Sequence, residues 1–169
     1  GPWPLSYFGM CQLLTCVDDF RPWVENYPVS AKSEAASALD SYIRNVRKMD
    51  RVRTDNAPEF AGANSDWVKM RIKHGVKPTT SQQYEPQTNG KAENQVRVQQ
   101  NAIRACMFGV DPKLWCQCAE YTAHTWNRVS KDGKPSPYKI VYRREPKIGY
   151  FKRFGCLCYA KVHVLRGDK

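Results

Sequence analysis

Two carboxylates in this sequence have the type and spacing for metal chemistry. Asp55 follows "RVRT", a run that predicts a short strand, and Glu93 lies in the first turn of a long predicted helix. Open α/β sheets place their sites at the carboxyl ends of strands, and carboxylates on rigid elements suit Mg²⁺, which takes oxygen ligands. The loop "QQYEPQTNG" is expected to return the helix to the strand end, which predicts a divalent-metal site. Two structural interpretations stay open: Asp55 can form a turn, and Glu93 can complement the helix dipole.

The helix that carries Glu93 has two dissimilar faces. Glu93, Arg97 and Arg104 share one side with Gln100, at helical spacing. The opposite side is apolar and consists of Ala92, Val96, Ile103, Cys106, Met107 and Val110. A phosphodiester held near Glu93 would therefore lie along the two arginines. The same pattern is also typical of a solvated charged face on an amphipathic helix, and both interpretations stay open.

The composition indicates a folded, basic protein. The chain has 169 residues, of which 41% are hydrophobic, and a formal charge of +11 from 27 Lys and Arg against 16 Asp and Glu. This size favours one domain, and the charge favours a polyanion such as nucleic acid, with a merely basic solvated surface as the alternative. No apolar run reaches the ~18 residues that span a bilayer, and no signal peptide is recognisable. The seven cysteines lack C-x-x-C spacing, which favours reduced thiols in an intracellular protein.

The elements that must position the two carboxylates alternate between strand and helix. A hairpin is predicted from "CQLLTCVDDF" and "WVENYPVS", because two apolar runs flank a polar turn. A helix over 31–48, capped by Ser33, and a strand over 50–56 follow, and then a helix over 64–75 that ends at Gly75 and a strand over 76–81. Two helices come next, over 91–110 and 111–129, and Asp111 caps the second. Short β-like pieces are expected beyond 138. This order predicts a mixed α/β sheet with helices on its faces.

Several short motifs, taken in order, resemble the catalytic core of a retroviral-type integrase, and most closely the Ty1/copia retrotransposon branch. They are "GPWPLS", "CVDDFRPWVENYPVSAKSEA", "VRTDNAPEF", "HGVKPTTSQQYEPQTNGKAEN", "LWCQCAEYTAHTWNRV" and "SPYKIVYRREPKIGYFKRFGCLCYAKV". The resemblance implies an RNase H-like α/β fold, a mixed sheet flanked by helices. It also implies a catalytic core over 1–130, followed over 131–169 by a linker and the C-terminal extension of copia-type integrases.

The resemblance also implies the site and its chemistry. Asp55 and Glu93 match the second and third members of a D,D,E triad that binds two divalent ions, Mg²⁺ or Mn²⁺, for in-line attack on a phosphodiester. Asn56, which follows the aspartate, is implied to support the metal ligands. The implied DNA contacts, which include a loop before the helix, are Tyr84, Gln87, Lys91, Asn94, Arg97 and Arg104. The implied partners are the DNA ends of the element and its target DNA, and the full-length integrase is expected to form homo-oligomers. No membrane association is implied. The implied location is intracellular, and nuclear in a eukaryotic host.

The sequence departs from the integrase pattern at its start. The first triad aspartate is expected on a first strand before "GPWP", and that strand is missing from this chain. Asp18 and Asp19 match a non-catalytic pair in the hairpin instead. The "CQLLTCV" strand is therefore expected to have an unpaired edge. An alternative function follows, that of a catalytically inactive DNA-binding or structural relative; a plain RNase H-like nuclease is disfavoured by the tail "FGCLCYA".

Overall fold

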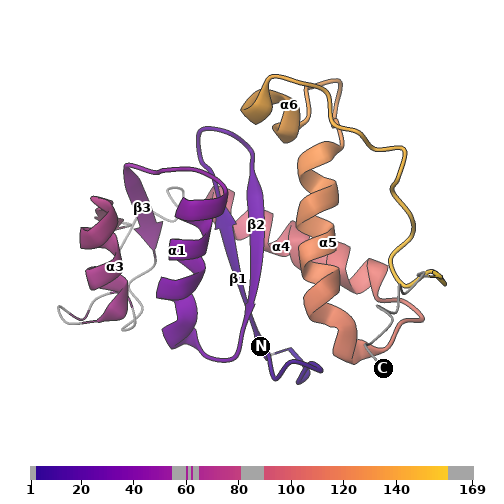
Figure 1. Ribbon diagram of the computed structural model, residues 1–169, viewed down its shortest axis with the longest axis horizontal. Helices are drawn as coiled ribbons and strands as arrows, with labels where there is room; N and C mark the ends of the chain where they lie inside the picture. Colours follow the sequence, from indigo (N-terminus) through magenta and orange to yellow (C-terminus); the bar gives the residue numbers. More distant parts are fainter. Residues whose placement is uncertain (1–2, 55–59, 61, 63–64, 81–89, 160–169) are drawn as a thin grey trace, which may run out of the picture.

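A computed structural model describes residues 3–54, 60, 62, 65–80 and 90–159 of the chain (Figure 1). The strands are β1 Gln12–Val17, β2 Val24–Val29, β3 Arg51–Thr54 and β4 Lys77–Thr80. The α-helices are α1 Ala35–Asn45, α3 Asp66–His74, α4 Gly90–Cys106, α5 Trp115–Arg128 and α6 Pro137–Tyr142. Short 3-10 turns at Lys32–Glu34 and Pro112–Leu114 lead into α1 and α5. Within these ranges, no helix combines the length and the apolar character needed to cross a bilayer.

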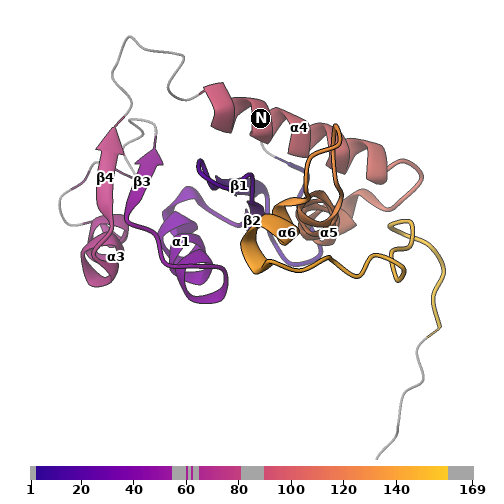
Figure 2. The same ribbon diagram turned by 90° about the horizontal axis from the view of Figure 1, so that it is seen from above.

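The strands form two separate pairs. β1 and β2 are antiparallel, in a register that runs from Gln12 opposite Val29 to Val17 opposite Val24. β3 and β4 are parallel, with Thr54 opposite Thr80 at their ends. No ladder joins β1 to β3 in the described part of the chain. Figure 2 shows the two pairs with α1 and α3 on one side and α4 on the other.

Each side of the strands has its own apolar core. Leu14 of β1 packs against a cluster from α1 and α3 that includes Leu39 and Trp67. Leu13, the preceding residue, packs against a cluster centred on Ile103 of α4 and Trp115 of α5. Adjacent residues of a strand point to opposite faces, so β1 contributes side chains to both cores.

Buried side-chain amides form hydrogen bonds between the β1–β2 hairpin and the helices α4 and α5. Asn26 of β2 donates through Nδ2 to Gln99 Oε1 at 3.0 Å and to the Ala119 carbonyl at 2.9 Å. Asn127 of α5 accepts from the backbone N–H of Val24 at 3.0 Å and donates to its carbonyl at 2.7 Å. Gln99 is fully buried although it lies outside the predicted apolar face of α4. The helix therefore turns a polar residue as well as Ile103 toward the core.

Most predicted elements are present, with two corrections. The hairpin is confirmed, and Gly75 ends α3 with a left-handed φ of 66°. Ser33 does not cap α1, because it lies inside a 3-10 turn. Residues 137–142 form α6 instead of a β-like piece. Ser136 Oγ accepts from the Lys139 N–H and a proline occupies the first turn, so the local signal for a helix start prevails.

Candidate metal and nucleic-acid site

A cleft of about 930 Å³ separates the two strand pairs, and residues next in sequence to the predicted site line it. Asp18 and Asp19, which follow β1, line it together with Thr54 at the end of β3. Ala92, in the first turn of α4, lines it from the other side. The first turn of α4 and the ends of β1 and β3 therefore line one cleft.

Asp55 and Asn56 lie outside the described residues, as do Tyr84 and Gln87. Thr54 precedes Asp55 in the sequence and Ala92 precedes Glu93, so the cleft is lined by a sequence neighbour of each predicted triad member. The Glu93 side chain is on α4 and exposed to solvent. Among the residues described, no group of three or more His, Cys, Asp or Glu side chains could hold a metal ion. The two-carboxylate metal site stays a prediction.

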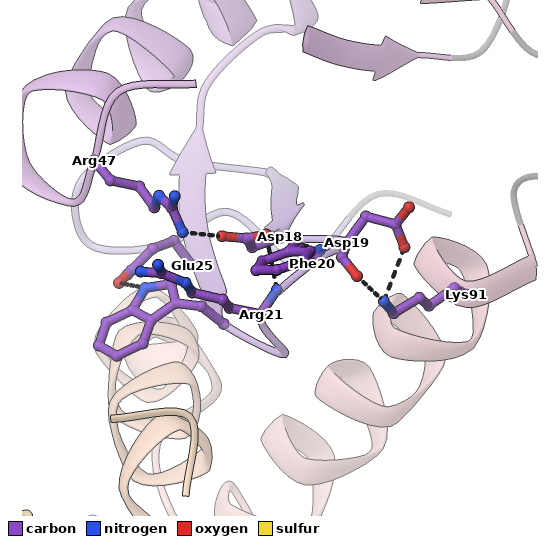
Figure 3. A network of polar contacts seen from close by, with 8 residues as sticks. Asp18, Asp19, Phe20, Arg21, Glu25, Arg47 and Lys91 are labelled. Atoms are coloured by element: carbon purple, nitrogen blue, oxygen red, sulfur yellow. Dashed lines mark hydrogen bonds and ion pairs between the residues drawn. The ribbon is translucent and has the colours of Figure 1, made fainter. Parts of the chain in front are cut away.

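Lys91 joins the start of α4 to the hairpin (Figure 3). Its Nζ lies 2.8 Å from Asp19 Oδ1 and also donates to the Asp19 backbone carbonyl. The hydrogen bond and charge of Lys91 hold the pKa of the Asp19 carboxyl below its ordinary value, and Arg53 adds to this effect. Lys91 is therefore committed to a carboxylate within the molecule, although its side chain remains 57% exposed.

Asp18 has a structural task in the same turn. Its Oδ1 accepts from the backbone N–H groups of Phe20 and Arg21, each at 3.0 Å. Its Oδ2 lies 3.0 Å from Arg47 Nη1, in an ion pair whose carboxylate is only 13% exposed. Figure 3 shows these contacts directed into the hairpin turn and away from Lys91. The carboxylate is therefore used to build the turn between β1 and β2.

The predicted phosphate-contacting residues of α4 are exposed. Arg97 donates to Asn94 Oδ1 at 2.7 Å, and Arg104 donates to Asn101 Oδ1 at 3.3 Å. The Arg104 guanidinium also lies 5.9 Å from the centre of the Trp3 ring. Neutral amides hold both guanidinium groups and leave their charge uncompensated at these contacts. Such a row can neutralise phosphates, with backbone contacts that carry no sequence information.

The link between Lys91 and Asp19 is the feature of this site that the sequence did not indicate. The two residues are 72 positions apart and each is an ordinary charged residue in its own element. No spacing rule relates a hairpin turn to a distant helix start. Their contact depends on how α4 is laid across the strands.

Known proteins resemble this chain in sequence and in fold. No family model matches the sequence. The chain is 23% identical over 147 residues to the Pol polyprotein of Radiation murine leukemia virus (strain Kaplan), and 22% identical to the Gag-Pol polyprotein of Feline leukemia virus. Each match covers 85% of this chain, but only 25% and 8% of the two polyproteins. The chain therefore spans at most a quarter of the length of these curated relatives.

Solved structures have a similar fold. The structure matches a chain of the simian T-cell lymphotropic virus intasome in complex with PP2A regulatory subunit B56 gamma, with a TM-score of 0.70 at 18% identity, over 95% of this chain and 56% of that one. It matches the dimeric form of the HTLV-2 integrase catalytic core domain in complex with magnesium, with a TM-score of 0.66 at 18% identity, over 84% of this chain and 90% of that one. The chain thus has the RNase H-like fold of integrase catalytic cores.

Proposed function

We propose that this chain is the catalytic core of an integrase encoded in a retroelement polyprotein, and that the longer protein binds DNA and catalyses metal-dependent phosphodiester cleavage and strand transfer. The integrase-core fold, the sequence similarity to Pol polyproteins and the charge of +11 all support this function. The order of the short motifs supports assignment to the Ty1/copia branch. The element ends and the target DNA are the substrates, and the location is nuclear in a eukaryotic host.

The meeting of β3 and α4 is the observation that carries the proposal. Thr54 and Ala92, from elements far apart in the sequence, line one cleft, and each is followed by a carboxylate residue. Exposed carboxylate oxygen is the donor that Mg²⁺ and Mn²⁺ prefer. Asp55 and Glu93 would hold the ions, with Asn56 supporting the ligands. Bound ions would polarise the phosphodiester and activate the attacking oxygen.

The side chains of α4 supply the binding surface. The backbone of the DNA would follow Arg97 and Arg104 away from Glu93, because these cations lie on the exposed side of the helix. Asn94 holds the Arg97 guanidinium at 2.7 Å and so orients it. Tyr84 and Gln87 would contact the DNA from the loop before the helix, and Lys91 would contact a phosphate once released from Asp19.

A catalytically inactive DNA-binding or structural relative is the second candidate. The contacts of Asp18 and Asp19 support this candidate. The Asp18 carboxylate accepts from the hairpin turn and pairs with Arg47, and the Asp19 carboxylate pairs with Lys91. Neither is free to complete a triad of carboxylates with Asp55 and Glu93. Catalysis by the longer protein then requires an aspartate from elsewhere in the polypeptide.

Homo-oligomerisation of the full-length integrase is also proposed. Dimeric and trimeric forms are known for the HTLV-2 integrase catalytic core domain. Sedimentation of the full-length protein as a single monomeric species over a wide concentration range would contradict this part of the proposal.

A strand-transfer assay with Mg²⁺ or Mn²⁺ tests the function. The 169-residue chain is compared with a longer protein that continues upstream of Gly1, and Asp55→Asn and Glu93→Gln are made in the longer protein. We expect activity only in the longer protein and its loss in both variants, with Asp18→Asn as the control that remains active. Activity of the short chain that disappears in Asp18→Asn would contradict the placement of the site. DNA binding without activity in any form would favour the inactive relative.

A further inference from the structure

The chain after α6 is rich in exposed cations. This strap, residues 143–154, carries five cationic side chains and one carboxylate, that of Glu145, which pairs with Lys139 of α6. The exposed cations of the strap are Arg143, Arg144, Lys147, Lys152 and Arg153. None of them forms an ion pair with a carboxylate among the residues that the structure describes. Their positive charge is therefore available to a polyanion.

The strap follows a fixed path although it contains no helix or strand. Figure 1 shows it beside α5, on the side away from β2. Tyr121 of α5 donates through its hydroxyl to the Lys152 carbonyl at 2.7 Å, and its ring lies 5.5 Å from that of Phe154. One turn later, His124 Nε2 lies 2.9 Å from the Tyr150 hydroxyl. Because these contacts already order the strap, a ligand would bind it without the cost of ordering a loose segment.

The ring of Tyr150 is the exposed part of an anchored side chain. Its hydroxyl contacts His124, yet the residue is 56% exposed. The next residue, Phe151, is half-buried and packs against His124, with the two rings 5.7 Å apart. Tyr150 lies between Lys147 and Lys152 in the sequence. An exposed aromatic ring flanked by cations is the arrangement on which unpaired bases stack while the cations contact phosphates.

We propose that the strap binds single-stranded nucleic acid. One base would stack on the Tyr150 ring, and the neighbouring phosphates would pair with Lys147, Lys152 and Arg153. This binding goes beyond the proposed function, in which DNA follows the arginines of α4, and it requires neither a metal ion nor strand transfer. Single-stranded DNA and single-stranded RNA share the phosphates and unpaired bases that the strap would contact, so either can be the ligand.

The exposed ring distinguishes a single strand from a duplex as the ligand. In a duplex each base is already paired and stacked between its neighbours, so its face cannot cover Tyr150. A duplex would contact only the cations of the strap, and its affinity would not depend on the ring. Separate measurements on single strands and on duplexes therefore show which of the two ligands uses Tyr150.

Fluorescence anisotropy of the 169-residue chain with labelled oligo-dT and oligo-rU, each of about 16 nucleotides, tests the proposal. We expect Tyr150→Leu to weaken single-strand binding about tenfold and to leave the affinity for a duplex unchanged. Tyr150→Phe keeps the ring and should bind within about twofold of the natural chain. The tighter of the two oligonucleotides identifies DNA or RNA as the ligand. Equal affinity of Tyr150→Leu and the natural chain, or no binding of either oligonucleotide, would overturn the proposal.

The salt dependence of binding tests the cations separately from the ring. Lys147→Gln combined with Lys152→Gln should lower the slope of log affinity against log salt by about 1.4 for a single strand. Lys69→Gln combined with Lys73→Gln removes the same charge from α3 and should leave the slope unchanged. An equal change of slope in the two double variants would overturn the proposal, because it would reflect net charge and not the strap.

One further variant separates this proposal from the proposed function. Arg97→Gln combined with Arg104→Gln removes the cations of α4 and should leave the effect of Tyr150→Leu on single-strand binding intact. Loss of that effect would overturn the proposal, because the single strand would then lie on α4. Since the assay contains no metal and no strand transfer is measured, its result is independent of whether the longer protein is an active integrase.

Discussion

The Nζ of Lys91 lies 2.8 Å from Oδ1 of Asp19, which ties the first turn of α4 to the turn of the β1–β2 hairpin. The contact holds a cation two residues before Glu93 in an intramolecular pair. Asp19→Asn should release Lys91 and remove one negative charge, so affinity for duplex DNA should rise about twofold to fivefold at low salt. Fluorescence anisotropy checks this, with Asp66→Asn as the control, because Asp66 pairs with Lys69 on α3, away from α4. Unchanged affinity in Asp19→Asn would show that Lys91 takes no part in binding.

We expect the arginines of α4 to make the affinity for DNA depend on salt concentration. Arg97→Gln and Arg104→Gln should weaken binding similarly for unrelated sequences, because phosphate contacts carry no sequence information. Each change should reduce the slope of log affinity against log salt by about 1. Lys69→Gln removes the same charge from α3 and should leave the slope unchanged. Sequence-dependent losses in the Arg97 variant would instead indicate a base contact.

Asp18 should tolerate loss of its charge better than loss of its side chain. Asn at this position keeps an acceptor for the Phe20 and Arg21 N–H groups and loses only the Arg47 pair, which should cost about 1 kcal/mol of unfolding free energy. Ala removes all three contacts and should cost about 2 to 3 kcal/mol. Urea denaturation compares the two variants. Equal destabilisation would mean that the turn does not depend on the Asp18 oxygens.

The buried amide of Asn26 should be among the most sensitive polar positions. Asn26→Ala leaves Gln99 Oε1 without its buried donor and removes one of the donors to the Ala119 carbonyl, which should cost about 2 to 4 kcal/mol. Asn45→Ala, at an exposed amide on α1, should cost less than about 0.5 kcal/mol. Thermal or urea unfolding measures both. A loss below 1 kcal/mol in the Asn26 variant, about the value of one ordinary hydrogen bond, would contradict this account of the interface between β2 and the helices.

The surroundings of Glu25 predict that the free energy of unfolding depends on pH. Burial raises the pKa of this carboxyl, and nearby Glu120 adds to the effect, while the Trp23 indole N–H and Arg128 oppose it. Because the native pKa lies above the unfolded one, the native state loses stability as pH rises from the unfolded pKa through the native pKa. Glu25→Gln keeps an acceptor for the indole N–H at 2.8 Å and lacks this loss. The variant should therefore gain stability relative to the natural chain as pH rises above about 4, the ordinary pKa of a glutamate carboxyl.

Urea denaturation across that pH range measures the difference between the two proteins. Other carboxyl groups with shifted pKa values, such as that of Asp19, are present in both proteins and cancel in the comparison. A difference that is constant with pH would show that Glu25 titrates alike in the native and unfolded states.

Local signals in the sequence predicted the elements that have local causes. The polar turn of the hairpin, Gly75 at the end of α3 and Asp111 before α5 each act through neighbouring residues, and each is present as predicted. The start of α6 has an equally local cause in Ser136, but β-branched and aromatic residues after it favoured a strand interpretation. Competition between two local signals produced that error.

Features that depend on tertiary packing were not predictable in the same way. Gln99 is polar, and only the position of Asn26 on a facing strand makes its burial favourable. The pairing of Lys91 with Asp19 likewise requires the path of α4 to be known. Among the described strands, β1 forms a ladder with β2 and β3 with β4.

The amide of Asn127, which satisfies both backbone groups of Val24, has a consequence for aggregation. The amide makes the hydrogen bonds that a neighbouring strand would make with Val24, so another molecule cannot pair with the outer edge of β2 at this residue. On the other side of the molecule, β4 carries Pro78, which has no N–H to offer an incoming backbone. An exposed strand edge is a template for pairing with another chain. The outer edges of β2 and β4 are guarded at these two positions, so they should be poor starting points for fibre formation.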